Sequence, residues 1–385
     1  MDESEGSTTT GRDALLFRLD RLGLLVRSLS SRGRRLASCV PLRPPPAVTL
    51  EGLLEEPLRL SPHAYARAEG KIITLEAPGS WARMTFHERS LLPLLYDLAV
   101  GRHASQMAAA TTEICKEAIL AVLALMSRCW LLETTEQEGW SGHDLRFHTR
   151  TRWGYARAAL GKINPEGEIV AQSAREASAQ SIHRLALERP DLPRLLTTDP
   201  PYALVSERRQ SVRRHGSVPL TSAQLSEFLF RTLCERSGRR PYPSGGACYP
   251  LKAYLAVHRC RGVRPGFYSY DSAVHELIFA AEPGHRLDKL LADAASAANV
   301  DQRPQVLLVL AARYSHVRRS YGDLSYSLIL KEVGAVFQTA MMAAAAMRLA
   351  TCPLGCGDSV LFSELIGENP HTETSVGELM LGSLD

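Results

Sequence analysis

The feature that most constrains the fold is a long, almost wholly apolar segment towards the C-terminal end of the chain. Residues 325–349 read SYSLILKEVGAVFQTAMMAAAAMRL, and residues 336–350 are the most apolar stretch of the sequence. This stretch is short for a membrane span and continues a segment that holds Lys331 and Glu332, so we expect a buried helix. Such a helix needs apolar surface around most of its circumference, and two-fold pairing with a second copy of the chain is the commonest way to supply it. We therefore expect a homodimer.

Composition and charge fit a cytoplasmic protein that is large enough for two domains. The 385 residues are 45% hydrophobic, and the formal net charge is only +4, with acidic and basic residues intermixed. Because no continuous basic stripe is present, we expect no nucleic-acid partner. The eight cysteines are scattered, and no second pair accompanies Cys352 and Cys356 at zinc-site spacing. We expect free thiols, no bound metal and no membrane or secretory segment, since the N-terminal residues MDESEGSTTTGRD are acidic and polar.

The pattern along the chain predicts an α+β protein with two folded parts. Residues 1–45 are expected to form an N-terminal arm and a proline-rich linker, PLRPPP. Residues 46–135 combine a predicted hairpin with two helices and a short strand, which suggests a small winged-helix-like α+β module. Residues 136–200 hold polar connectors and one long helical candidate. Residues 201–385 alternate strands and helices, which indicates helices packed on a central sheet.

The first candidate for a ligand-binding motif is ERRQSVRRHG at residues 207–216. Arg209, Ser211 and Arg213 alternate, so they would project from one face of an extended segment. Two guanidinium groups and a hydroxyl suit a phosphate monoester, because arginine contacts phosphate through two charge-assisted hydrogen bonds. The alternative is a solvated basic turn.

Two glycine-containing loops are the other candidates. Ser244, Gly245 and Gly246 precede a strand-like alternation, and glycine lets backbone amides approach a flat ligand closely because it has no Cβ. The alternative is an ordinary tight turn into a core strand. The loop CPLGCGD follows the long apolar helix, and its alternative is a plain helix stop at residues 353–355.

The order and spacing of these three motifs resemble the nitroreductase-like flavoprotein fold. PSGGACYPLKAYL, the run RRSYGDLSYSLILKEVGAVFQTAMMAAAAM and TSVGELMLGS are more narrowly similar to azoline dehydrogenases of thiazole/oxazole-modified peptide pathways, the SagB-type group and the cyanobactin-type oxidase included. The resemblance covers about residues 200–384. Residues 47–133 resemble, more faintly, the winged-helix leader-peptide-binding modules of such pathways.

The resemblance implies an FMN-dependent oxidoreductase with its cofactor at the interface of a homodimer. The residues implied to hold the FMN phosphate and ribityl chain are Arg209, Ser211 and Arg213. Those implied to line the isoalloxazine are Ser244, Gly245 and Gly246, with Pro353, Leu354 and Gly355 on its other side. The implied reaction oxidises a thiazoline or oxazoline of a ribosomally made precursor peptide to the azole. A base takes a proton from one ring carbon, flavin N5 takes a hydride from its neighbour, and oxygen reoxidises the flavin. A cyclodehydratase is a further partner that such a pathway implies.

One position departs from the family pattern. The family has a Lys-Tyr pair before the long helix, in which the lysine transfers a proton, whereas this chain has Ser320 and Tyr321. Serine has no amine to titrate, so Tyr321 works alone or with water, another side chain substitutes, or the chemistry has changed. Two alternatives follow: an NAD(P)H-dependent flavin reductase of nitro, quinone or enone groups, or a catalytically weakened scaffold subunit of a cyclodehydratase–oxidase complex.

Overall fold

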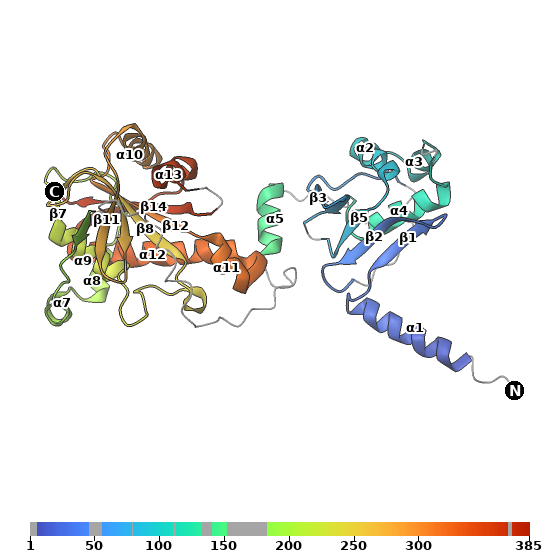
Figure 1. Cartoon of the computed structure of the whole chain (residues 1–385), viewed down its shortest axis with the longest axis horizontal. Helices are drawn as coiled ribbons and strands as arrows, with labels where there is room; N and C mark the ends of the chain where they lie inside the picture. The colour runs from blue at the N-terminus through green and yellow to red at the C-terminus, as the bar shows by residue number, and fades with distance from the viewer. Residues whose placement is uncertain are drawn as a thin grey trace. The chain divides into compact units, whose positions relative to one another are not determined.

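The computed structural model describes residues 6–45, 56–78, 80–110, 113–132, 141–151, 183–368 and 372–385. The chain forms two compact units, residues 1–158 and 159–385, shown in Figure 1. Most of the long helical candidate in the predicted connector lies outside the described residues.

The first unit is built on an antiparallel sheet of five strands in the order β1-β2-β5-β4-β3. The strands are β1 (Arg27–Ser31), β2 (Arg34–Pro41), β3 (Tyr65–Glu69), β4 (Ile72–Glu76) and β5 (Ala82–Phe86). The helices are α1 (Gly6–Arg21), α2 (Pro93–Val100), α3 (Ala104–Ala110), α4 (Lys116–Arg128) and α5 (Gly142–Arg150). Its core joins sheet residues such as Met84 and Phe86 to apolar side chains of α2, α3 and α4.

The structure differs from the predicted arm at residues 1–45. Strands β1 and β2 form a hairpin, and β2 pairs with β5 from Ala37 opposite Phe86 onwards. The tight turn between the strands places Arg32 and Gly33 in the left-handed region, with φ of 48° and 77°. The strand β2 was not predicted because basic residues surround its apolar positions. Two of these positions, Ala37 and Cys39, are fully buried. The winged-helix-like character of residues 46–135 stays a prediction.

The second unit is built on an antiparallel sheet of seven strands in the order β13-β14-β12-β8-β10-β11-β6. The strands are β6 (Arg184–Ala186), β8 (Leu251–Val257), β10 (Gly266–Asp271), β11 (Glu276–Ala281), β12 (Val306–Ala312), β13 (Leu349–Pro353) and β14 (Thr374–Ser383). A two-residue parallel pair joins β7 (Leu220–Thr221) to β9 (Cys260–Arg261). Because β6 belongs to this sheet, the end of the predicted connector packs with the C-terminal part of the chain.

Helices cover both faces of the seven-stranded sheet (Figure 1). Alternate residues of β8 point to opposite sides: Leu255 packs with α9 (Ser222–Thr232) and α12 (Ser325–Met347), whereas Ala256 packs with α10 (His285–Ala297) and α13 (Ser359–Ile366). The remaining helices are α7 (Leu192–Thr198), α8 (Tyr202–Arg208) and α11 (Tyr314–Tyr321). The expected α+β class, with helices on a central sheet, is confirmed.

The long apolar segment forms α12, as its sequence predicts. By length and composition, one helical stretch of the described residues, Val317–Met347, could cross a membrane. Its inner face instead packs in the core of the second unit, through side chains that recur at helical spacing: Ile329, Val333, Val336, Ala340 and Ala344.

Candidate functional site

The glycine motif forms a strained loop at residues 244–249. Gly245–Ala247 make one short 3-10 turn, and the φ angles of Gly246, Ala247 and Tyr249 are 60°, 56° and 43°. A left-handed conformation costs a residue with a Cβ roughly 1–2 kcal/mol, so other contacts must hold Ala247 and Tyr249 in place.

A side chain outside the loop supplies the main contact. Ser244 Oγ donates to Glu332 Oε2 of α12 at 2.6 Å and accepts from the Tyr249 backbone N–H at 2.9 Å. One hydroxyl thus closes the loop on itself and ties it to the long helix. The two glycines face outwards and are exposed, so their backbone is free to approach a ligand.

The structure brings the glycine loop and Tyr321 together. A Cβ built on Gly245 would be 3.9 Å from Tyr321 Oη and 3.9 Å from Leu328 Cδ1. Burial raises the pKa of the half-buried Tyr321 hydroxyl, so it stays protonated at neutral pH. Ser320 precedes it on α11 and is also half-buried.

The arginine motif lies beside the third motif. The Val212 backbone N–H donates to the Thr351 carbonyl at 2.8 Å, so the extended segment after α8 runs along β13. Arg209 is half-buried, while Ser211 and Arg213 are exposed. Neither arginine pairs with a carboxylate among the residues that the structure describes, so both guanidinium groups are available to an anion.

The CPLG motif is only partly the loop that we predicted. Residues up to Pro353 belong to β13, which pairs with β14, and Leu354 buries its side chain in the core while its N–H donates to the Glu378 carbonyl at 2.9 Å. The helix stop is Arg348, whose φ of 56° ends α12 before the motif begins. Gly355 is exposed, and no atom lies within 4 Å of the position that a Cβ would take there. Leu354 could therefore offer only its backbone to a ligand, beside the half-buried Pro353 and the exposed Gly355.

Within one copy of the chain, these motifs form two groups. Among the described residues, no hydrogen bond or ion pair joins the glycine loop to the arginine segment or to residues 353–355.

Sequence reasoning missed Glu332. Its side chain is 5% exposed, and its Oε1 has no hydrogen-bond partner. Burial raises its pKa to about 7, against the opposing effects of Ser244 and Arg240. The signal was present, because Glu332 is the one acid in an otherwise apolar run, four residues after Leu328 on the same helix face.

Cys248 lies in the same loop but is a poor nucleophile. Its thiol is half-buried, and burial, together with the charge of Glu332, raises its pKa. In the described part of the chain, no group of three or more His, Cys, Asp or Glu side chains could hold a metal ion.

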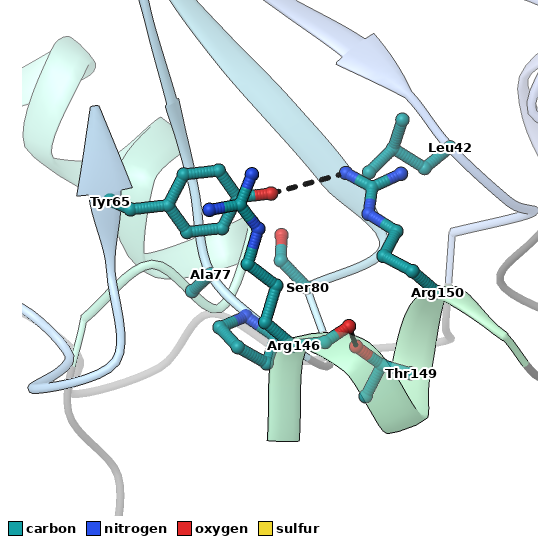
Figure 2. Close-up of a pocket in the computed structure, with 8 residues that line it drawn as sticks. Leu42, Tyr65, Ala77, Ser80, Arg146, Thr149 and Arg150 are labelled. Atoms are coloured by element: carbon teal, nitrogen blue, oxygen red, sulfur yellow. Dashed lines mark hydrogen bonds between the residues drawn. The ribbon is translucent and has the colours of Figure 1, made fainter. Parts of the chain in front are cut away.

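Figure 2 shows a small pocket in the first unit, whereas all three motifs belong to the second unit. The Arg146 guanidinium lies 3.7 Å from the centre of the Tyr65 ring, and Tyr65 Oη donates to Glu76 Oε2 at 2.7 Å. Arg150 contacts both Tyr65 and Glu76. These contacts anchor α5 on the sheet, and the buried Glu76 balances the nearby arginines.

A groove of about 710 Å³ lies between α10 and α13, and Asp358, the last residue of the CPLGCGD loop, is among the residues that line it. Its charged lining residues are mostly paired with each other, as in Arg286 with Glu364 and Lys289 with Asp358.

Two family models match separate parts of the chain. The Nitroreductase family matches residues 207–382, and the cyanobactin oxidase ThcOx matches residues 58–157. A protein of Methanocaldococcus jannaschii that is named as a nitroreductase is 33% identical over 175 residues, which are 44% of this chain and 84% of that protein.

Solved structures were also compared. A nitroreductase structure from Anabaena variabilis aligns with a TM-score of 0.49 at 14% identity, covering 100% of this chain and 90% of that chain. The Escherichia coli microcin synthetase complex, solved with truncated pro-MccB17 bound, aligns with a TM-score of 0.40 at 17% identity. The alignment covers 66% of this chain and 85% of that chain.

An oxidoreductase of the α+β class is what the fold and the family matches define. The chain belongs to the nitroreductase family. Proteins of this family bind flavin. The nitroreductase-like fold expected from the sequence is thereby confirmed.

Proposed function

We propose that the protein is an FMN-dependent dehydrogenase that oxidises azolines to azoles in a ribosomally made precursor peptide. One observation carries the proposal: a single chain joins a segment similar to a cyanobactin oxidase, residues 58–157, to a nitroreductase domain, residues 207–382. The first segment suits recognition of a peptide, and the second suits redox chemistry on a flavin.

The described residues fit FMN. Arg209 and Arg213 have no carboxylate partner among them, and Ser211 lies exposed between the two, which suits a phosphate dianion. The backbone at Gly245 and Gly355 is exposed and so accessible to a flat ring. The residues that we propose as the FMN site are Arg209, Ser211, Arg213, Ser244, Gly245, Gly246, Pro353, Leu354 and Gly355.

Bound FMN would supply the acceptor for two electrons. The chain would supply orientation and proton handling. Tyr321 points its hydroxyl towards Gly245, next to the proposed ring surface. With its raised pKa, Tyr321 is a neutral hydroxyl, which would position the azoline or hold a water molecule that takes the proton from the ring carbon, with Ser320 beside it.

The quaternary arrangement is part of the proposal. In one copy, the glycine loop has no hydrogen bond to the arginine segment, and α12 exposes the apolar residues Tyr326 and Leu330. A homodimer would cover this face and bring the glycine loop of one copy to the arginine segment of the other. We further propose that residues 46–135 bind the leader of the precursor peptide, that a cyclodehydratase is a partner, and that the protein works in the cytoplasm.

The proposal is tested with the purified full chain. We expect the visible spectrum of a bound flavin, either as isolated or after reconstitution with FMN. We also expect an azoline-containing peptide to lose the mass of two hydrogens under air. A protein that stays colourless after reconstitution would exclude the proposal.

One specific observation favours a second candidate, a flavin reductase that uses NAD(P)H: Ser320 stands where related azoline dehydrogenases have lysine. Anaerobic addition of NADPH separates the two. Rapid bleaching of the flavin supports the reductase, and a flavin that stays oxidised supports the dehydrogenase.

A further inference from the structure

The loop that faces the proposed FMN ring depends on one hydroxyl. The left-handed residues Ala247 and Tyr249 make residues 244–249 costly to hold in this conformation. Ser244 Oγ bridges the Tyr249 N–H and the Glu332 carboxylate, and so it connects both ends of the strained segment to a buried point on α12. The loop's own backbone contributes only two short-range bonds, from Ala247 to Ser244 and from Cys248 to Gly245.

The groups around Glu332 compensate the charge of its carboxylate only in part. The charged and titratable groups that act on it are Arg240, Tyr242 and Cys248. Arg240 directs its Nη1 to Tyr242 Oη at 2.9 Å and to the Leu251 carbonyl at 2.7 Å. Among the described residues no ion pair reaches Glu332, and Oε1 has no partner. Of the residues that the structure describes, Ser244 is therefore its one hydrogen-bond donor.

We propose that the Ser244–Glu332 hydrogen bond is the latch that holds residues 244–249 in their ligand-facing conformation. Glu332 is then a positioning residue whose protonation is coupled to the binding of FMN at the proposed site. The second part rests on the proposed FMN site. The first part concerns the protein without its cofactor and can be decided separately.

The direction of the coupling follows from electrostatics. A flat ring over Gly245 and Gly246 removes water from around the Ser244–Glu332 pair, which disfavours the charged form of the carboxyl. Bound FMN should therefore raise the pKa of Glu332 further, above its value of about 7. Affinity for FMN should then be higher where Glu332 is protonated and should fall as the pH rises through that range.

Cys248 reports on the latch without any flavin. Its thiol is half-buried inside the loop, and its alkylation by iodoacetamide can be followed by peptide mass spectrometry, separately from the exposed Cys115 and Cys356. At one fixed pH, Ser244→Ala and Glu332→Leu should increase Cys248 labelling about tenfold, the change expected from the loss of one buried hydrogen bond. Glu332→Gln keeps the bond, because an amide oxygen accepts it, and should label only slightly more than the wild type, since it loses the charge that raises the Cys248 pKa. Glu364→Gln removes an exposed carboxylate from α13 and serves as the control.

FMN titrations test the coupling. Affinity is measured by quenching of FMN fluorescence from about pH 6 to about pH 8.5 in the wild type, Glu332→Gln and Glu364→Gln. The FMN phosphate itself titrates at about pH 6 in every sample, so only the difference in pH dependence between the proteins is informative. We expect the wild type and Glu364→Gln to lose about tenfold more affinity across this range than Glu332→Gln, which corresponds to a pKa change of about one unit on binding.

The possible results separate the claims. Unchanged Cys248 labelling in Ser244→Ala would overturn the latch, whatever FMN does. A wild type whose affinity follows the same pH profile as Glu332→Gln would overturn the proton coupling. If no protein binds FMN, the proposed function fails, while the labelling still decides whether the latch exists.

Discussion

At the scale of single residues, the sequence revealed the candidate motifs but not the contact that organises one of them. The alternation of Arg209, Ser211 and Arg213 and the paired glycines could be read directly. The Ser244–Glu332 bond could not, because its partners are 88 residues apart and meet only once α12 packs beside the loop. A lone acid in an apolar helix was its only trace in the sequence.

The role of Tyr321 is the prediction that belongs to this scale. Tyr321→Phe removes the hydroxyl beside Gly245 and keeps the ring, so we expect azole formation to slow by about 100-fold, with FMN still bound. The rate is measured by mass spectrometry in single-turnover reactions with an azoline peptide. Tyr202→Phe, on the exposed surface of α8, is the matched control and should react like the wild type. Undiminished azole formation by Tyr321→Phe would show that Tyr321 takes no part in the reaction and that another group handles the proton lost from the azoline ring.

At the scale of elements, segments with a clear period or cap were predictable, and segments that depend on a neighbour were not. The helix α12 and the strand β8 follow from their patterns. Strand β13 was predicted as a loop because of Pro353 and Gly355, yet pairing with β14 makes it a strand. Strands β1 and β2 were missed for the same reason, since their order comes from the sheet that they join.

The cap of α9 gives a prediction at this scale. Thr221 makes a complete capping box, in which its Oγ accepts from the Gln224 N–H at 3.2 Å. Thr221→Ala should therefore lower the free energy of unfolding by about 1 kcal/mol, measured by urea denaturation. Ser222→Ala, at the first helical position, should change it by less than about 0.5 kcal/mol. Equal losses in the two variants would contradict the assignment.

At the scale of the whole molecule, the sequence indicated an N-terminal module before a C-terminal sheet domain, and the structure has two units with separate cores. The apolar character of α12 also indicated that a single copy of the chain would leave part of its apolar surface uncovered. One face of α12 packs in the core, while Leu330 stays 38% exposed. What a single chain leaves open is how the glycine loop and the arginine segment meet, since no hydrogen bond between the described residues joins them.

The proposed homodimer would account for both observations, and a charge in its interface should break it. An aspartate at an apolar contact must lose its water on pairing, so Leu330→Asp should convert a dimer to a monomer in light scattering coupled to size-exclusion chromatography. If each FMN site needs both copies, the same variant should lose at least about tenfold in FMN affinity, because one wall of the slot is missing. Leu196→Asp, at an 86% exposed position on α7, is the matched control and should stay dimeric with full affinity. A wild type that binds FMN tightly as a monomer would refute the two-copy site, since every wall would then come from one chain.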